Sequence, residues 1–388
     1  MDENQKFIGS LLGPAFLASV DRSGTRVEKD QCVYIVDGYQ VPSGYRAYLL
    51  DFRFSEALAM NLHSYCPTSS VLYGISCEGI NDFDVVEVNE KGQLRIVYSD
   101  AEEDNVLFIS NKCNSNCIMC PDSNANRQLD LGRDKDYLFK LVELIPSDAR
   151  HLTITGGEPT LLTWDFIRLL AKCKEKFTNT DFLMLSNGRT LCIKEYRDAF
   201  LEAVPHSFRL GIPLYAASAK EHDSITRAEG SFEQTLAALK VLQHRIDIEI
   251  RIVVMKNNYR KIPEIAEFIC KEIPRVRHVC MMGIELMGNA AIARDDLWVD
   301  FVDTAPYLER AATTLFSAGI DAMIYNYPLC SLPRHLWNIA EKSITEYKIR
   351  YKEECANCEI KDLCGGFFFS TMHFEDITVR PIVGDSEE

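Results

Sequence analysis

The spacing of apolar and polar positions changes along the chain, and from about residue 105 two types of segment alternate. Short apolar runs rich in branched and aromatic residues predict strands at residues 107–109, 152–155, 182–185, 210–214, 248–254 and 279–282. Between them, apolar residues recur at helical intervals over 137–144, 164–176, 232–244 and 262–271. Six strand-then-helix units predict a parallel sheet with right-handed crossovers, either open or curled into a partial barrel.

The segments on either side of this region have different patterns. Residues 1–104 are strand-rich, with a strand at 32–36, a hairpin made by 84–88 and 93–98, and a helix around 55–63. After about residue 300 the alternation fades, although a helix is predicted over 301–317. We therefore expect three units: a strand-rich N-terminal domain (1–104), an α/β domain (105–299) and a small C-terminal module (300–388).

Three cysteines lie in one short loop directly after the first strand of the α/β region. Cys113, Cys117 and Cys120 have the spacing Cys-x-x-x-Cys-x-x-Cys, which lets three thiolates converge on one face of a loop. Such a set can hold three irons of a cubane cluster and leave the fourth iron open to another ligand. Two other interpretations are a zinc site without a nearby fourth ligand and three unrelated core thiols.

The loops after the next two strands carry residues suited to close contact with a ligand. Gly156, Gly157 and Glu158 follow the second strand, and Ser186 and Asn187 follow the third. Paired glycines let a backbone approach a ligand closely, although each motif alone is more typical of a tight turn. Because the carboxyl ends of parallel strands share one edge of a sheet, these loops and the three-cysteine loop should meet there.

A second group of cysteines lies near the C-terminus. Cys355, Cys358 and Cys364 are closely spaced, and Cys330 upstream completes a set of four. Four thiolates can fully ligate either a four-iron cluster or a zinc ion, and the spacing does not name the metal. The remaining cysteines show no metal-like spacing, so we interpret them as core residues.

Composition and charge narrow the possible functions. The chain has 388 residues, 47% hydrophobic, and its net charge of -15 argues against a broad nucleic-acid surface. Basic pairs such as Arg245 with Arg251, or Arg275 with Arg277, are expected on solvated faces. The 14 cysteines indicate a reducing compartment, and no apolar run is long enough to cross a bilayer, so we expect a cytoplasmic protein without membrane contact.

The three-cysteine loop, together with the sequence Gly-Gly-Glu-Pro after the second strand, resembles the radical S-adenosylmethionine (SAM) superfamily. The resemblance implies a partial (β/α)6 barrel and a [4Fe-4S] cluster on Cys113, Cys117 and Cys120, with SAM on the open iron. It further implies that the backbone at Gly156, Gly157 and Glu158 contacts the SAM amino group, and that Ser186 and Asn187 lie near the ribose or carboxylate. SAM is then cleaved to methionine and a 5′-deoxyadenosyl radical.

A narrower resemblance extends from about residue 106 to 368. The segments 211–215, 221–232, 282–286 and 325–326, with the cysteine-rich ending 355–368, look like maturases of the His-Xaa-Ser system, which modify ribosomally made peptides. The ending is similar to a shortened SPASM or twitch module, which implies one auxiliary [4Fe-4S] cluster on Cys330, Cys355, Cys358 and Cys364. Arg227 could reach the SAM carboxylate through a bidentate contact, whereas His222 is better explained as a structural residue.

These resemblances together imply an enzyme that removes hydrogen from a precursor peptide and installs a modification such as a crosslink. Flavodoxin or ferredoxin would deliver the electron, and the N-terminal domain could hold the leader of the peptide by pairing with a sheet edge. One alternative is a radical SAM enzyme acting on a protein side chain or a small molecule. Another is a non-enzymatic iron-sulfur or zinc protein.

Overall fold

The N-terminal part of the chain forms one mixed sheet. The computed structural model describes residues 7–38, 40–122, 126–129, 133–344, 348–372 and 377–384. The N-terminal strands are β1 (Ser10–Leu12), β2 (Phe16–Asp21), β3 (Cys32–Val36), β4 (Ala47–Asp51), β5 (Ser70–Ile75), β6 (Val85–Val88) and β7 (Leu94–Tyr98). Their order in the sheet is β1-β5-β4-β3-β2-β6-β7, with β2 to β5 parallel and the flanking strands antiparallel.

The helix α1 (Glu56–Tyr65) covers one face of this sheet. The side chain of Ser55 caps the helix by accepting a hydrogen bond from the Leu58 amide. Alternate residues of β3 enter different cores, because Tyr34 packs with α1 whereas Val33 and Ile35 pack on the opposite face. The strands, hairpin and helix expected in this region are therefore present.

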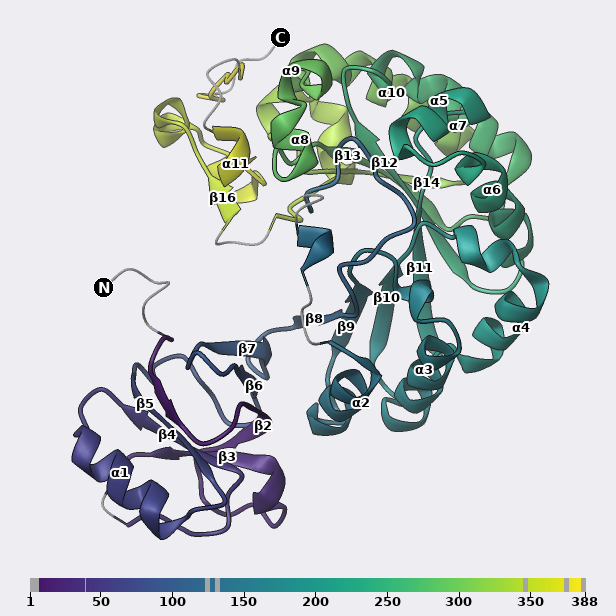
Figure 1. The fold of residues 1–388 in the computed structure, drawn as a ribbon. Coiled ribbons are helices and arrows are strands. Elements are labelled where there is room, and N and C mark those ends of the chain that lie inside the picture. The colour runs from purple at the N-terminus through teal and green to yellow at the C-terminus, as the bar shows by residue number, and fades with distance from the viewer. Residues whose placement is uncertain are drawn as a thin grey trace.

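A second sheet contains eight parallel strands and curls into a half-barrel (Figure 1). In chain order they are β8 (Asp104–Phe108), β9 (His151–Thr155), β10 (Asp181–Leu185), β11 (Ser207–Pro213), β12 (Asp247–Val254), β13 (His278–Gly283), β14 (Asp321–Tyr325) and β15 (Ala340–Glu341). The first six are the strands that the apolar runs predict. The fold class expected from the sequence, an α/β partial barrel, is thus confirmed, and the sheet continues beyond residue 299 through β14 and β15.

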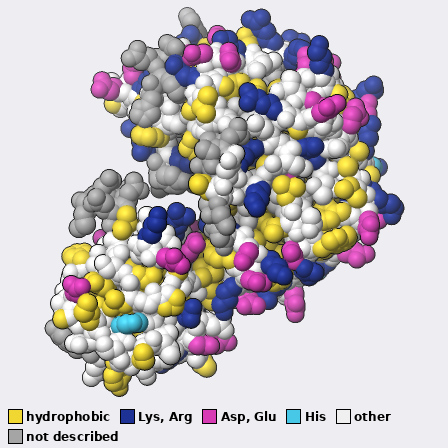
Figure 2. Space-filling view, in the orientation of Figure 1, with side chains coloured by type: hydrophobic (Ala, Val, Ile, Leu, Met, Phe, Trp, Pro, Cys, Tyr) yellow, Lys and Arg dark blue, Asp and Glu magenta, His cyan; other side chains and the backbone are white. Residues whose placement is uncertain are grey.

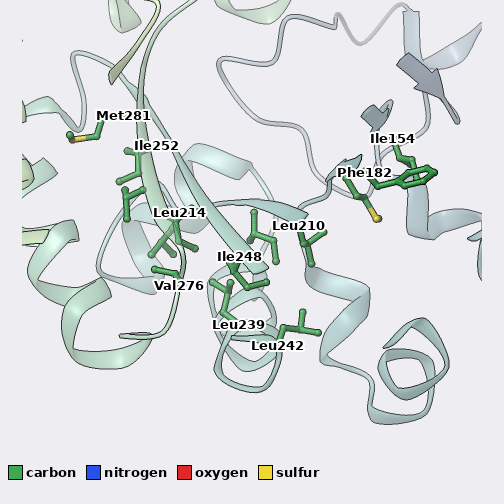
Figure 3. Close-up of a cluster of buried hydrophobic side chains, with 14 of the residues drawn as sticks. Ile154, Phe182, Leu210, Leu214, Leu239, Leu242, Ile248, Ile252, Val276 and Met281 are labelled. Atoms are coloured by element: carbon green, nitrogen blue, oxygen red, sulfur yellow. The ribbon is translucent and has the colours of Figure 1, made fainter. Parts of the chain in front are cut away.

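Helices cover the convex face of this sheet. They are α2 (Lys135–Leu144), α3 (Trp164–Lys176), α4 (Lys194–Ala203), α5 (Ala219–Thr226), α6 (Ser231–Leu242), α7 (Ile262–Glu272) and α10 (Phe301–Ser317). Every second strand residue packs against these helices in one large core. For example, Ile248 of β12 belongs to the same core as Leu239 and Leu242 of α6 (Figure 3). The apolar residues recur at helical intervals because one face of each helix packs against the sheet.

The intervening strand residues face the concave side, the lumen of the half-barrel. Thr153, Leu183, Arg251 and Tyr325 occupy such positions, and all are partly exposed, whereas their strand neighbours toward the helices are buried. For Arg251 the sequence predicted a solvated face, and this prediction is wrong. It lies in the lumen with 22% of its side chain exposed.

The C-terminal segment contains little regular structure (yellow in Figure 1). It has the short helix α11 (Phe369–Met372) and the paired strands β16 (Ile349–Arg350) and β17 (Phe367–Phe368); two further short helices, α8 (Asn289–Ile292) and α9 (Arg294–Leu297), precede α10. Basic and acidic side chains are interspersed on the face shown in Figure 2. Across the described ranges, every helix is too short or too polar to cross a membrane.

Candidate active site

The three-cysteine loop begins directly after β8, at the carboxyl edge of the parallel sheet. Cys113, Cys117 and Cys120 are all partly exposed and free of disulfides. Burial, reinforced by the neighbouring thiols of Cys120 and Cys113, raises the pKa of Cys117 to about 12. The loop therefore holds three thiols whose deprotonation would be favoured by a positively charged metal centre.

Hydrogen-bond donors point at two of these sulfurs. The Ser115 amide lies 3.4 Å from the Cys113 Sγ atom, and Arg127 Nη2 lies 3.2 Å from the Cys120 Sγ atom. Arg127 also donates to the Ser115 carbonyl oxygen. Arg127 could not be predicted from the sequence, because a single arginine after a loop carries no pattern that distinguishes it from a surface cation.

The glycine pair packs against the backbone of the three-cysteine loop. A Cβ atom on Gly156, whose φ is +144°, would lie 2.3 Å from the Ser110 carbonyl oxygen, and one on Gly157 would lie 2.3 Å from that of Lys112. The amides of Gly157 and Glu158 donate to these same two oxygens, at 2.5 and 2.8 Å. The two motifs thus form one structural unit, in which both glycines are required by close approach.

Glu158 joins the ends of β9 and β10. Its fully buried carboxylate accepts hydrogen bonds from the Thr160 amide and hydroxyl, from the Ser186 hydroxyl at 2.8 Å and from the Asn187 amide at 2.7 Å. Burial raises the pKa of Glu158, and these donors oppose that effect. The Glu158 side chain therefore positions Ser186 and Asn187. These three residues, which the sequence predicts to lie at the ligand site, are thus in direct contact.

Asn187 extends this network to the three-cysteine loop. Its side-chain amide lies 2.6 Å from Asn114 Oδ1 and 3.9 Å from the Cys113 Sγ atom. Arg189, two residues further on, donates to the Asn114 carbonyl oxygen and to the Ser115 hydroxyl. The loops after β8, β9 and β10 therefore meet as the sequence predicts.

Segments far along the chain hold the other side of the loop. The amides of Asn116 and Ile118 donate to carbonyl oxygens at the end of α5, at 2.9 and 3.0 Å. The Asn289 amide donates to the Cys120 carbonyl oxygen at 2.9 Å, and a Cβ atom on Gly288 would lie 2.1 Å from that of Pro121. Neither Gly288 nor Asn289 was predicted, because the sequence marks them by nothing more than a Gly-Asn pair after the sixth strand.

Arg227 and His222 lie in or after α5 but in different environments. Arg227 adopts a left-handed conformation (φ 49°) at the C-terminus of α5, and its exposed side chain lines a surface pocket with Ser224 and Lys256. His222 is 1% exposed, stacks on Tyr215 and accepts a hydrogen bond from the Tyr215 amide at Nδ1. Burial lowers the pKa of His222 to about 4, which fits a neutral structural residue.

The four C-terminal cysteines converge although they come from separate turns. Cys330, Cys355, Cys358 and Cys364 line one pocket, whose other walls include Pro328, Phe367 and Val379. The amides of Leu329 and Gly366 each lie 3.4 Å from the Cys364 Sγ atom. The structure therefore brings together all four thiols that the sequence singles out.

The spacing of the sulfurs bears on the size of the group that each cysteine set could hold. Four thiolates around one zinc ion lie about 3.8 Å apart, because each Zn–S bond is about 2.3 Å. Among the described residues, neither cysteine set brings three sulfurs within 4.8 Å of one another. Both sets are thus more widely spaced than a single tetrahedral ion requires, which fits the larger iron-sulfur cluster.

Residues 107–269, from β8 into α7, match the Radical SAM superfamily. This segment is less than half of the chain, and it contains the three-cysteine loop and the glycine pair. The chain therefore carries a domain of the radical SAM enzymes, which confirms the wider of the two resemblances. For the matched domain, this superfamily implies a [4Fe-4S] cluster and SAM as cofactors.

Solved structures add a looser similarity. The structure of SuiB from Streptococcus suis bound to the precursor peptide SuiA aligns with a TM-score of 0.45 and 14% identity, covering 57% of this chain and 48% of that one. Native anSMEcpe with bound SAM aligns with a TM-score of 0.44 and 16% identity, covering 57% and 63%. The chain thus spans about half the length of SuiB. No curated protein matches the chain by sequence.

Proposed function

We propose that this protein cleaves SAM reductively and abstracts hydrogen from a ribosomally synthesised peptide to install a modification. The observation that carries the proposal is the union of the three-cysteine loop with the glycine pair, since Gly157 and Glu158 hydrogen-bond to the loop at Ser110 and Lys112. An iron-sulfur carrier needs no second loop packed so closely on its cluster ligands. The peptide substrate rests on the resemblance to His-Xaa-Ser maturases.

In this proposal Cys113, Cys117 and Cys120 hold the cluster by three irons. When bound, that cluster supplies the electron that cleaves SAM. Arg127 and the Ser115 amide donate toward two of the ligand sulfurs and so stabilise their negative charge. The loop's anchors on β9 and α5 hold the three sulfurs in a fixed arrangement.

The SAM site is assigned to the surface around the glycine pair. Because the SAM amino group donates hydrogen bonds, the carbonyl groups of this turn are the backbone groups that would accept from it, while the amides of Gly157 and Glu158 are engaged with the three-cysteine loop. Ser186 and Asn187 would lie beside the ribose or carboxylate, and Glu158 acts through them as a positioning residue. Arg227 is the proposed partner of the SAM carboxylate, which requires its exposed side chain to turn toward the loop.

Cys330, Cys355, Cys358 and Cys364 are proposed to hold an auxiliary [4Fe-4S] cluster. All four coordination positions come from the protein, so this site would serve electron transfer and local structure. The same composition would suit zinc, and the wide sulfur spacing favours the cluster. An external flavodoxin or ferredoxin is the proposed electron donor, and the N-terminal sheet is the proposed holder of the leader peptide.

The proposal is tested by assaying anaerobically reconstituted, reduced protein for 5′-deoxyadenosine in the presence of SAM. We expect 5′-deoxyadenosine to form, and about eight irons per chain to be bound. A protein that carries the expected iron but cleaves no SAM, with or without peptide, would instead be an iron-sulfur carrier. About four irons together with bound zinc would assign zinc to the C-terminal site.

A further inference from the structure

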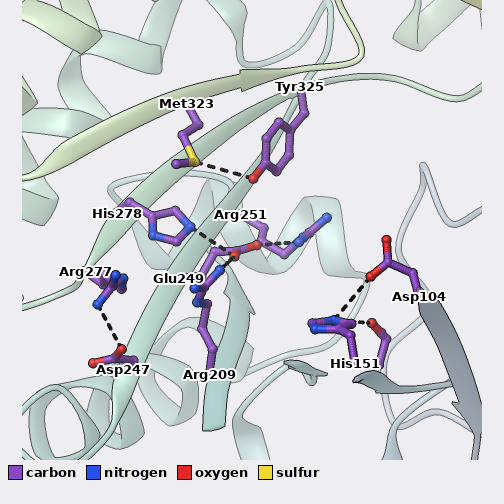
Figure 4. Close-up of polar contacts among 11 residues, drawn as sticks. Asp104, His151, Arg209, Asp247, Glu249, Arg251, Arg277, His278, Met323 and Tyr325 are labelled. Atoms are coloured by element: carbon purple, nitrogen blue, oxygen red, sulfur yellow. Dashed lines mark hydrogen bonds and ion pairs between the residues drawn. The ribbon is translucent and has the colours of Figure 1, made fainter. Parts of the chain in front are cut away.

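A charged cluster occupies the lumen of the half-barrel, on the strands that follow the cysteine and glycine loops (Figure 4). Glu249 of β12 lies at its centre, 2% exposed, with Arg251 Nη1 on one carboxylate oxygen. His278 Nε2 lies 3.0 Å from the other oxygen, and Arg209 Nη1 lies 3.8 Å from it. One carboxylate is therefore shared by two guanidinium groups and an imidazole.

The positive charge of this cluster exceeds the single negative charge of the Glu249 carboxylate, and one of its hydrogen-bond donors is left without an acceptor among the described residues. Burial alone would raise the pKa of Glu249, but the hydrogen bond from His278 and the charge of Arg251 outweigh burial and lower it. Glu249 is therefore ionised, and two arginines leave the cluster with a net positive charge. In addition, the buried Nε atom of Arg209 has no hydrogen-bond partner within the described part of the chain.

Three members of this region also carry groups that can ligate a cation. Ligand atoms of Glu249, His278 and Cys280 lie within 4.8 Å of one another. A divalent cation would displace or repel the two guanidinium groups that already neutralise Glu249. Burial also raises the pKa of Cys280 to about 12, so its thiol stays protonated. The charge balance favours an anionic ligand over a metal.

Arg251 is the member of the cluster that lies furthest toward the carboxyl edge of the sheet, because in the strand register it lies beside Pro213, whereas Glu249 lies beside Gly211 and Arg209 beside Asp247. Gly211 on the neighbouring strand leaves room for the side chain of Arg251, since a Cβ atom there would lie 3.1 Å from Arg251 Cδ. Among apolar side chains on the same face, Leu185 Cδ2 would lie 2.8 Å from that Cβ atom, and Met323 lies beside Cys280, the strand neighbour of Arg251.

We propose that Arg251, with Arg209 behind it, binds an acidic side chain of the peptide substrate within the barrel lumen. The inference rests on the proposed function and adds the substrate's chemistry. A planar guanidinium presents paired donors to a carboxylate, and the surrounding apolar wall contacts the hydrocarbon part of the side chain. Glu249 and His278 position the two arginines. The alternative source of such a carboxylate is SAM itself.

The test uses two matched probes, acetyl-Ala-Glu-Ala-amide and acetyl-Ala-Gln-Ala-amide, with anaerobic holoenzyme and SAM. Dissociation constants are measured by ligand-observed NMR for the wild type and for Arg251→Gln, Arg251→Lys and Arg277→Gln. We expect the wild type and Arg277→Gln to prefer the glutamate probe by about tenfold. Arg277 pairs with Asp247, and both side chains are about half exposed, so Arg277→Gln is a matched arginine control. Arg251→Gln should bring the ratio to about one, and Arg251→Lys should retain part of it.

Equal binding of both probes by the wild type, or an unchanged preference in Arg251→Gln, would overturn the proposal. SAM affinity is measured for each variant as well, because a loss there with an unchanged probe ratio would assign Arg251 to the SAM carboxylate and also overturn it. Thermal unfolding identifies a variant that fails to fold, in which case Arg251→Lys decides. Failure of the proposed function is seen separately, as absence of 5′-deoxyadenosine from the wild type.

Discussion

The two cysteine sets differ in what holds them in place. The three-cysteine loop is anchored by hydrogen bonds and close backbone contacts to β9, α5 and the Gly288 region. The four C-terminal cysteines lie among isolated turns and two-residue strands, with few backbone hydrogen bonds beyond their own turns. The first arrangement is held by backbone contacts from several parts of the fold, whereas the second depends on its ligands and on side-chain packing, such as that of Phe367 against Phe301 of α10.

This difference separates two roles for a metal centre. A site whose ligands are fixed by the fold can leave one coordination position open for a substrate, because the protein supplies the geometry. A site in a weakly structured segment obtains its structure from the metal, as small metal-dependent domains do. We therefore expect the three-cysteine loop to determine activity and the four-cysteine set to determine the order of the C-terminal segment.

The largest effect is expected from Cys113→Ala. Loss of one of only three ligands should remove the barrel cluster and reduce 5′-deoxyadenosine formation below detection. Iron should fall from about eight to about four per chain, because the C-terminal set is untouched. Cys270→Ala, a partly exposed cysteine of α7, is the control and should retain both iron and activity. Loss of all iron in Cys113→Ala would show that the two sites are not independent.

Gly157→Ala should come next. Its Cβ atom would lie 2.3 Å from the Lys112 carbonyl oxygen, so the cysteine loop must move by a substantial part of an ångström. We expect SAM cleavage to fall about 100-fold, since misplacement on that scale has such consequences. Gly38→Ala is a suitable control, because a Cβ atom there meets nothing within 4 Å. Normal activity in Gly157→Ala would mean that the two loops are not mechanically joined.

Cys358→Ser should have a smaller effect on SAM cleavage and a different effect on structure. SAM cleavage without peptide should stay within a few-fold of the wild type, while limited proteolysis should cut more readily between residues 330 and 364. Both follow from the metal-dependent order of this segment. If the proteolytic pattern were unchanged, the protein alone would be sufficient to order these turns.

The smallest effect is expected on the pH dependence of folding stability, through His222 of the barrel. His222 is neutral in the folded protein because burial lowers its pKa to about 4, against an ordinary value of 6.5. The unfolded chain therefore binds a proton first as the pH falls, and stability decreases below about pH 6.5. Between pH 7 and 5 the loss should be about 2 kcal/mol. Urea unfolding followed by tryptophan fluorescence should show a smaller loss in His222→Asn; an equal loss would exclude His222 as the cause.

The sequence predicts those parts of the molecule in which apolar residues recur at regular intervals or cysteines are closely spaced. Apolar runs located the strands and helices, and cysteine spacing selected both thiol sets. The anchors Gly288, Asn289 and Arg127 were missed, because contacts between residues far apart in the chain leave no local pattern. The lumen charges were missed for another reason: alternating charged residues on a strand look the same whether they face solvent or a lumen, as Arg251 illustrates.

The anchoring of the three-cysteine loop also has a consequence for folding. Its hydrogen bonds join Asn116 to Thr226 and Cys120 to Asn289, so the partners are more than 100 residues apart in the chain. Contacts of such separation form late, after the intervening units have been synthesised and docked. The loop should therefore acquire its final shape only when the barrel is complete. Loading of the cluster would then follow barrel folding, and cells short of iron would accumulate a folded but empty barrel.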